Sequence, residues 1–68
     1  MVEEIKRNVT DLFWTDMDEM VAELKNNGYS IEEANEEYVV IRDVNENGYA
    51  CYLGHANSTM WIGHIEEE

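Results

Sequence analysis

Residues 38–65, YVVIRDVNENGYACYLGHANSTMWIGHI, contain three runs of β-branched and aromatic side chains separated by turn residues. The runs are Tyr38 to Val44, Tyr49 to His55 and Thr59 to Ile65. Each run has the composition of a strand. The Asn47-Gly48 pair favours a two-residue type I′ hairpin turn, and Asn57-Ser58 is expected to form a second two-residue turn. The stretch therefore predicts three antiparallel strands in a meander.

Residues 29–37 allow two interpretations. Tyr29 to Ala34 alternates weakly between apolar and polar residues, which predicts a fourth strand. Ser30-x-x-Glu33 is also a capping box, which would make Ile31 to Glu37 a short helix. We adopt the strand as the prediction and keep the short helix as its alternative.

Upstream of the strands, the apolar residues follow the period of a helix. At 3.6 residues per turn, Phe13, Met17, Met20, Val21 and Leu24 fall on one stripe. Thr10 can cap the start of this helix, and Asp16 with Glu19 forms a competing, later capping box. Gly28 predicts its end. Whether Val2 to Val9 adds a helical turn or a strand is left open.

These elements predict an α+β fold, with one amphipathic helix packed on a four-stranded antiparallel β-meander. The 68 residues suit a single small acidic domain spanning residues 1–68. A chain of this length has little room for a deep internal cavity, so catalysis is disfavoured from the outset.

The expected turn lengths assign the sheet side chains to two faces. An even-length turn at Asn47-Gly48 places Val40, Val44, Tyr49, Cys51 and Leu53 on one face and Val39, Ile41 and Tyr52 on the other. The two-residue turn at Asn57-Ser58 then adds Met60 and Ile62 to the first face and Trp61 and Ile65 to the second. One helix covers one face only. Either the N-terminal segment covers the second face, or Tyr52 and Trp61 form an exposed aromatic patch of the kind found at interfaces.

The charge of the chain limits its partners. Sixteen acidic residues against four basic ones give a net charge of −12. Such a chain repels nucleic acid and anionic membranes, so we expect it to bind a basic protein surface instead. On the helix the acids are Asp11, Asp16, Asp18, Glu19 and Glu23. On the first hairpin they are Glu32, Glu33, Glu36 and Glu37.

No catalytic or metal-binding motif is complete. Asp43-x-Asn45-x-Asn47-Gly48 matches the first half of an EF-hand loop, but the twelfth position, which needs a bidentate carboxylate, is Gly54. A hairpin turn accounts for the same residues. The spacing of Cys51, His55 and His64 matches no structural zinc pattern. We therefore expect no enzyme activity, no cofactor and no metal.

Cysteine use and the first residues indicate a location. A single cysteine, Cys51, forms no internal disulfide, and Met1 to Glu4 is acidic where a signal peptide would be basic. The expected location is the cytoplasm, or the host cytoplasm if the chain is encoded by a phage.

In size, acidity and lack of a catalytic motif, the chain resembles the small inhibitors that phages encode against restriction, CRISPR or repair enzymes, and the acidic immunity proteins paired with nuclease toxins. The resemblance is one of general character. It implies an inhibitor of a nucleic-acid-handling protein or nuclease that presents a phosphate-like acidic surface. The predicted partner-binding residues are Asp16, Asp18, Glu19, Glu23, Glu32, Glu33, Glu36, Glu37, Tyr52 and Trp61. The alternative is a cellular protein-interaction module, with a homodimer formed through the sheet and the charge serving only solubility.

Overall fold

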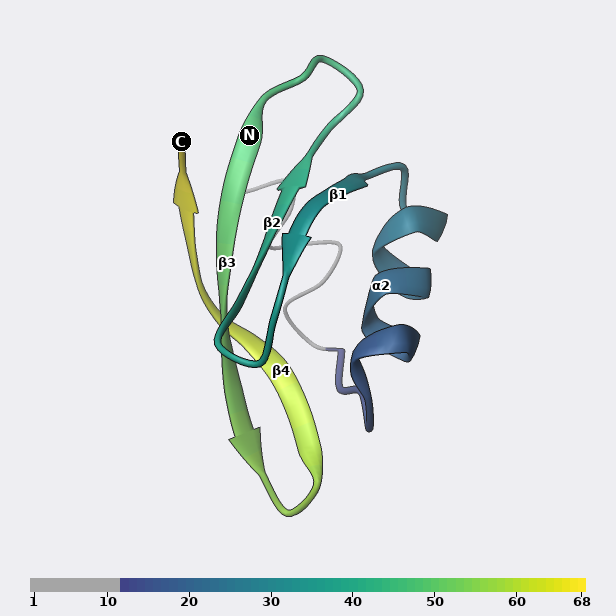
Figure 1. Ribbon diagram of the computed structural model, residues 1–68, viewed down its shortest axis with the longest axis vertical. Coiled ribbons are helices and arrows are strands. Elements are labelled where there is room, and N and C mark those ends of the chain that lie inside the picture. Colours follow the sequence, from purple (N-terminus) through teal and green to yellow (C-terminus); the bar gives the residue numbers. More distant parts are fainter. Residues whose placement is uncertain (1–11) are drawn as a thin grey trace.

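The computed structural model describes residues 12–68 and has one helix on one face of a four-stranded antiparallel sheet (Figure 1). The elements are α2 (Met17–Asn26), β1 (Ser30–Ala34), β2 (Tyr38–Arg42), β3 (Gly48–Ala56) and β4 (Thr59–Glu67). The strands lie in the order β1-β2-β3-β4. The predicted helix on a four-stranded meander is confirmed, and residues 31–34 belong to a strand, not to the alternative short helix.

The helix starts at the later of the two predicted caps. The Asp16 side chain accepts a hydrogen bond of 2.8 Å from the Glu19 N–H, so Asp16 is the N-cap. The Glu19 carboxylate turns back and accepts from the Thr15 hydroxyl at 2.8 Å. Gly28, at φ +92°, follows the end of the helix in the left-handed region. The rival cap, Thr10, lies outside the described residues, as do Asp11 and Val2 to Val9.

The buried face of α2 follows the predicted stripe with one exception. Met20 and Leu24 are fully buried, and Met17 and Val21 pack on the core at its margin. Phe13 was expected in the stripe but is 64% exposed, because it precedes the helix in an extended segment. Its neighbour Trp14 points the other way and is buried instead. In the part of the chain that the structure describes, no helix has the length and apolarity of a membrane span.

The register between β2 and β3 differs from the prediction. Val39 pairs with Cys51 and Ile41 with Tyr49, so all four side chains share one face. The cause is the connection, which has five residues, 43–47, in place of a two-residue turn at Asn47-Gly48. An odd loop length moves each β2 side chain to the other face relative to β3.

The other predicted members of the first face shift accordingly. Val40 now pairs with Ala50 on the face away from the helix, and Val44 is 83% exposed within the loop. The prediction that these two valines share a face with Tyr49 and Cys51 is wrong for the same reason, the length of the loop.

The Asp43 side chain organises this five-residue loop. Its Oδ1 accepts from the Asn45 N–H at 2.8 Å and the Asn47 N–H at 3.0 Å, and its Oδ2 accepts from the Tyr49 hydroxyl at 3.2 Å. Desolvation raises the pKa of Asp43, but the hydrogen bonds from these three residues outweigh it and hold the pKa below its ordinary value. The half-match to an EF-hand loop is therefore accounted for by an internally bonded turn.

A β-bulge shifts the register between β3 and β4 by one residue. Asn57 and Ser58, with φ of 53° and 65°, form the predicted two-residue turn, and Leu53 pairs with Ile62. Between Tyr52 and Leu53 the register shifts by one residue, so Cys51 pairs with Ile65. Ile65, predicted on the second face, is therefore buried in the core.

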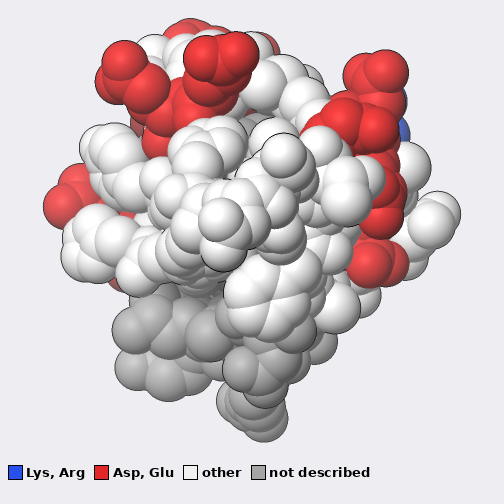
Figure 2. All heavy atoms as spheres, turned by 90° about the horizontal axis from the view of Figure 1, so that it is seen from below, with Lys and Arg blue, Asp and Glu red and all other residues white. Residues whose placement is uncertain are grey.

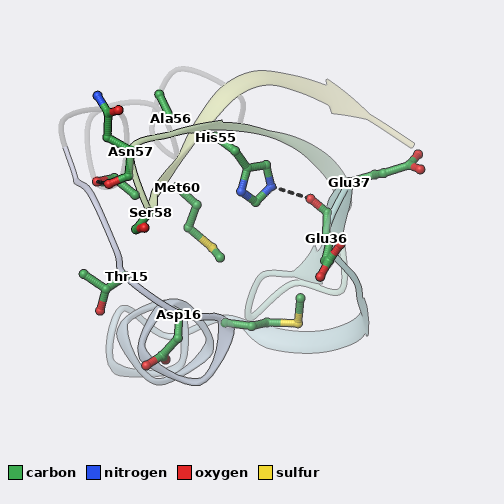
Figure 3. Close-up of a pocket in the computed structure, with 11 residues that line it drawn as sticks. Thr15, Asp16, Glu36, Glu37, His55, Ala56, Asn57, Ser58 and Met60 are labelled. Atoms are coloured by element: carbon green, nitrogen blue, oxygen red, sulfur yellow. Dashed lines mark hydrogen bonds between the residues drawn. The ribbon is translucent and has the colours of Figure 1, made fainter.

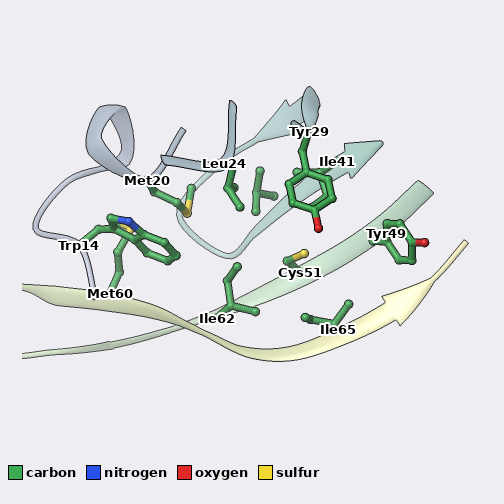
Figure 4. Packing of buried hydrophobic residues seen from close by; sticks show 11 residues of the cluster. Trp14, Met20, Leu24, Tyr29, Ile41, Tyr49, Cys51, Met60, Ile62 and Ile65 are labelled. Atoms are coloured by element: carbon green, nitrogen blue, oxygen red, sulfur yellow. The ribbon is translucent and has the colours of Figure 1, made fainter. Parts of the chain in front are cut away.

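The bulge and the odd loop together gather the apolar side chains on one face of the sheet, beneath α2 (Figure 4). The buried cluster comprises Trp14, Met20, Leu24, Tyr29, Val39, Ile41, Tyr49, Cys51, Met60, Ile62 and Ile65. Within residues 12–68, α2 and the segment of Leu12 and Trp14 that precedes it cover this apolar face.

Leu24→Ala tests this packing. Leu24 is fully buried in the last turn of α2, so its truncation should lower the free energy of unfolding by about 2–5 kcal/mol, a large share of the stability of a 68-residue domain. Urea unfolding measures the change. Val44→Ala is the control, since an 83% exposed side chain should contribute less than about 0.5 kcal/mol. Equal effects of the two variants would contradict the assigned core.

Asp43→Asn tests the loop through its pH dependence. Because the pKa of Asp43 is lower in the folded state, ionised Asp43 stabilises the fold above the ordinary carboxyl pKa, and this contribution is lost as the pH falls through the lowered value. The variant should therefore unfold at lower urea than the parent at pH 7. The difference between them should shrink below about pH 4. A difference that is constant from neutral to acid pH would show that the carboxylate does not organise the loop.

Candidate functional site

An open groove of about 820 Å³ lies among the described residues (Figure 3). Three segments line it: the start of α2, the turn between β1 and β2, and the tip of the β3–β4 hairpin. The lining residues are Thr15, Asp16, Met17, Glu36, Glu37, His55, Ala56, Asn57, Ser58, Thr59 and Met60. The groove exists because β3 and β4 run past the end of the helix, which leaves the end of the inner sheet face uncovered (Figure 1).

Backbone hydrogen bonds hold the helix start beside the hairpin. Trp14 and Met60 form an isolated antiparallel bridge, with the Trp14 N–H donating to the Met60 carbonyl at 2.9 Å and the Met60 N–H donating back at 2.7 Å. The chain then passes through Thr15 to the cap Asp16. This bridge sets the position of the Asp16 carboxylate relative to β4.

The opposite wall of the groove is the β1–β2 turn. The Asn35 side chain accepts from the Glu37 N–H at 2.8 Å and from the Tyr38 N–H at 3.0 Å, which fixes the turn. His55 Nε2 lies 2.6 Å from the Glu36 carbonyl oxygen, and because a carbonyl only accepts, Nε2 carries the hydrogen of this bond. These hydrogen bonds hold the backbone of Glu36 and Glu37, and the exposed carboxylates of the two residues form no ion pair with a described residue.

The groove combines negative charge with apolar surface. Among residues 12–68, three of the side chains that line it are carboxylates and none is a lysine or arginine. Met60 is buried and points into the space between Asp16, Glu36 and His55 (Figure 3). Met17 is a second thioether in the lining. Such a surface is complementary to a cationic group attached to an aliphatic chain.

Of the ten predicted partner-binding residues, the structure brings three together in this groove: Asp16, Glu36 and Glu37. Neither spacing nor periodicity indicated that these acids line one groove, because Asp16 lies 20 residues before Glu36 and on a different element. Sequence reasoning also missed His55, Met17 and Met60 as parts of a groove. The sequence held one local indication of the β1–β2 turn that lines the groove, namely Asn35, a residue typical of turns.

The other predicted acids lie elsewhere. Asp18 and Glu19 are exposed in the first turn of α2 and Glu23 is half-buried further along the helix. Glu32 forms an ion pair of 3.2 Å with Arg42, and the Glu33 carboxylate accepts a hydrogen bond from the Tyr38 hydroxyl. Seen from the groove end, acidic side chains form separate groups around an uncharged area (Figure 2). The predicted acidic surface is thus divided, not one continuous ridge.

Tyr52 and Trp61 lie on the sheet face opposite the helix, away from the acidic groove. Tyr52 is 41% exposed and lies between Tyr38 on β2 and His64 on β4, with ring centroids 6.2 and 5.9 Å away. These three residues are direct cross-strand partners. The indole of Trp61 lies over Gly54, where a Cβ atom would come within 2.6 Å of the ring. The N-terminal segment, the alternative cover for this face, lies outside residues 12–68.

Cys51 and the two histidines do not share a site. Cys51 is fully buried and faces the helix, whereas His64 is exposed on the opposite face and His55 lies at the groove. No group of three or more metal-ligating side chains occurs among residues 12–68. Burial raises the pKa of the Cys51 thiol to about 12, so desolvation, not the surrounding acids, makes this thiol unreactive.

Comparisons with protein-family models, with curated proteins and with solved structures found no match for the chain.

The thiol offers a direct test of the fold around the sheet. In the native protein at pH 8, Cys51 should react with Ellman's reagent at least about a hundredfold more slowly than in urea, because it is buried and protonated. Absorbance at 412 nm measures the rate. Reaction of the native protein at the rate of a free thiol would contradict the assigned burial of Cys51.

Proposed function

We propose that this protein binds and inhibits a nucleic-acid-handling protein, by presenting fixed carboxylates to the basic surface that otherwise holds phosphate groups. The expected partner is a nuclease or another nucleic-acid-binding protein, met in the cytoplasm or, for a phage-encoded chain, in the host cytoplasm. No catalytic role is proposed.

The observation that carries the proposal is that many carboxylates of the folded protein have no ion-pair partner among residues 12–68. Within residues 12–68, the ion pairs join Arg42 to Glu32 and Glu68, and His64 to Glu66. The exposed carboxylates of Asp18, Glu36 and Glu37 are not among them. Like charges at this density disfavour the compact state, and a basic partner would relieve that repulsion on binding.

Rigid placement supports the same proposal. The Asp16 carboxylate is held by the helix start, and hydrogen bonds to the Asn35 side chain fix the backbone of the turn that carries Glu36 and Glu37. Charges that are already in position lose less conformational entropy when a partner binds than charges on a disordered tail. An acidic tail would serve solubility equally well without such a scaffold.

A panel of purified nucleases and DNA-binding proteins, assayed for binding and for inhibition, tests the proposal. At least one member should bind, and its affinity should fall roughly tenfold or more between about 50 and 200 mM NaCl, because opposite charges drive the association. A short DNA duplex should compete with the protein for that member. Inhibition of no member, or binding that is unchanged by salt, would contradict the proposal.

A second candidate function follows from the row of Tyr38, Tyr52 and His64, in which Tyr52 and His64 are exposed and Tyr38 is half-buried. Exposed aromatic side chains on a small sheet suit an interaction or homodimerisation module in which the charge serves only solubility. Tyr52→Ala separates the two candidates. Under the inhibitor proposal it leaves binding unchanged, whereas loss of binding or of a dimer in sedimentation analysis would favour the second candidate.

A further inference from the structure

The chain contains two Asn-Gly pairs, Asn27-Gly28 and Asn47-Gly48. In such a pair the backbone nitrogen of the glycine is able to attack the side-chain carbonyl carbon of the asparagine, because glycine has no side chain to hinder the approach. Both pairs therefore carry an intrinsic reactivity, and the contacts of each asparagine decide whether the folded protein restrains it.

Asp43 holds Asn47 by three hydrogen bonds across the β2–β3 loop. Its Oδ1 accepts from the Asn47 N–H at 3.0 Å, and its Oδ2 accepts from the Asn47 side-chain amide at 3.2 Å. The Asp43 N–H donates to the Asn47 carbonyl oxygen at 3.0 Å. Asn47 is exposed, so these hydrogen bonds, and not burial, fix its side chain.

Asn27 is held in a different way, by the end of α2. Its side-chain amide donates to the Glu23 carbonyl at 2.9 Å. The Gly28 N–H, which is the attacking group of this pair, donates to a carbonyl of the last helical turn at 3.0 Å. The same turn carries Leu24, which is fully buried. Release of Asn27 therefore requires the helix end to leave the core, whereas release of Asn47 requires only the loop to open.

We propose that Asn47 is a site of self-modification, at which the chain converts to isoaspartate when the β2–β3 loop opens, and that Asp43 restrains this reaction in the folded protein. The Gly48 nitrogen loses its proton to solvent and forms a bond to the side-chain carbonyl carbon of Asn47. The bond from this carbon to Nδ2 breaks, and Nδ2 takes up a proton from solvent and leaves as ammonia. Water then opens the cyclic imide at one of its two carbonyls, which gives isoaspartate or aspartate. This chemistry does not depend on the proposed function.

The products are incompatible with the loop as the structure has it. Either product replaces the amide that donates to Asp43 with a carboxylate, so two like charges meet. Isoaspartate also adds a methylene group to the main chain of a loop whose length sets the side-chain faces of β2. A chain that reacts while open is thereby lost from the folded population. Asn47→Asp, which carries the aspartate product, should unfold at lower urea than the parent, and an unchanged midpoint would contradict this loss.

Trypsin separates the two sites, since cleavage after Lys25 and Arg42 leaves Asn27 and Asn47 in different peptides. The folded full chain is incubated at mildly alkaline pH and then digested. Mass spectrometry follows the loss of each amide, and an isoaspartyl methyltransferase identifies isoaspartate. Asn47 of the folded parent should react about tenfold or more slowly than in the urea-unfolded chain, since hydrogen bonds to a charged group ordinarily change an equilibrium by about this factor.

Asp43→Asn tests the restraint, under conditions in which circular dichroism shows the variant to be folded. Asn47 should then react severalfold faster than in the parent, whereas Asn27 of the same molecules should keep the parental rate. Val44→Ala changes an exposed side chain of the same loop and is the control that should alter neither rate. If Asp43→Asn does not fold, the parent in graded urea takes its place, and Asn47 should begin to react at lower urea than Asn27.

An Asn47 rate that is unchanged in folded Asp43→Asn, or that is the same in the folded and unfolded parent, would overturn the proposal. Equal acceleration of Asn47 and Asn27, in the folded variant or along the urea series, would also overturn it, because the reaction would then follow global unfolding. The nuclease panel tests the proposed function alone, so failure of either proposal leaves the other in place.

Discussion

The Asp43 carboxylate holds the loop that sets the side-chain faces of the whole sheet. By accepting hydrogen bonds from Asn45, Asn47 and Tyr49, it stabilises a five-residue connection between β2 and β3. The odd length brings the apolar residues of both strands to the same face. With a loop of even length, half of them would point away from the helix, and a domain with one helix could not bury them.

Concentrating the core on one face has consequences at both sides of the sheet. The helix and the Trp14–Met60 bridge cover most of the inner face but stop short of the β3–β4 hairpin tip, and the groove forms in the space that remains. On the outer face, the residues that do not enter the core include Tyr38, Tyr52 and His64, which meet as cross-strand partners. The acidic groove and the aromatic row thus lie on different surfaces, so variants of one leave the other intact.

The acidic residues are of two kinds: those whose carboxylates hold local structure and those whose carboxylates do not. Asp16 and Glu19 cap the helix and Asp43 holds a loop. Within residues 12–68, the carboxylates of Glu36 and Glu37 form no ion pair, and these residues line the same groove as Asp16. Carboxylates that the fold does not use are the ones that a basic partner can engage at the least cost to stability.

Local patterns in the chain were enough to predict the helix, its cap at Asp16 and its end at Gly28, because capping and amphipathic periodicity depend on neighbouring residues. They also predicted the strands and the Asn57-Ser58 turn. The faces of Val39, Ile41 and Ile65 were not predicted, since a single residue of loop length or a bulge reverses them. The groove could not be predicted either, because it depends on how far the hairpin extends past the helix, and on a bridge between residues 14 and 60 that only the packed chain brings into contact.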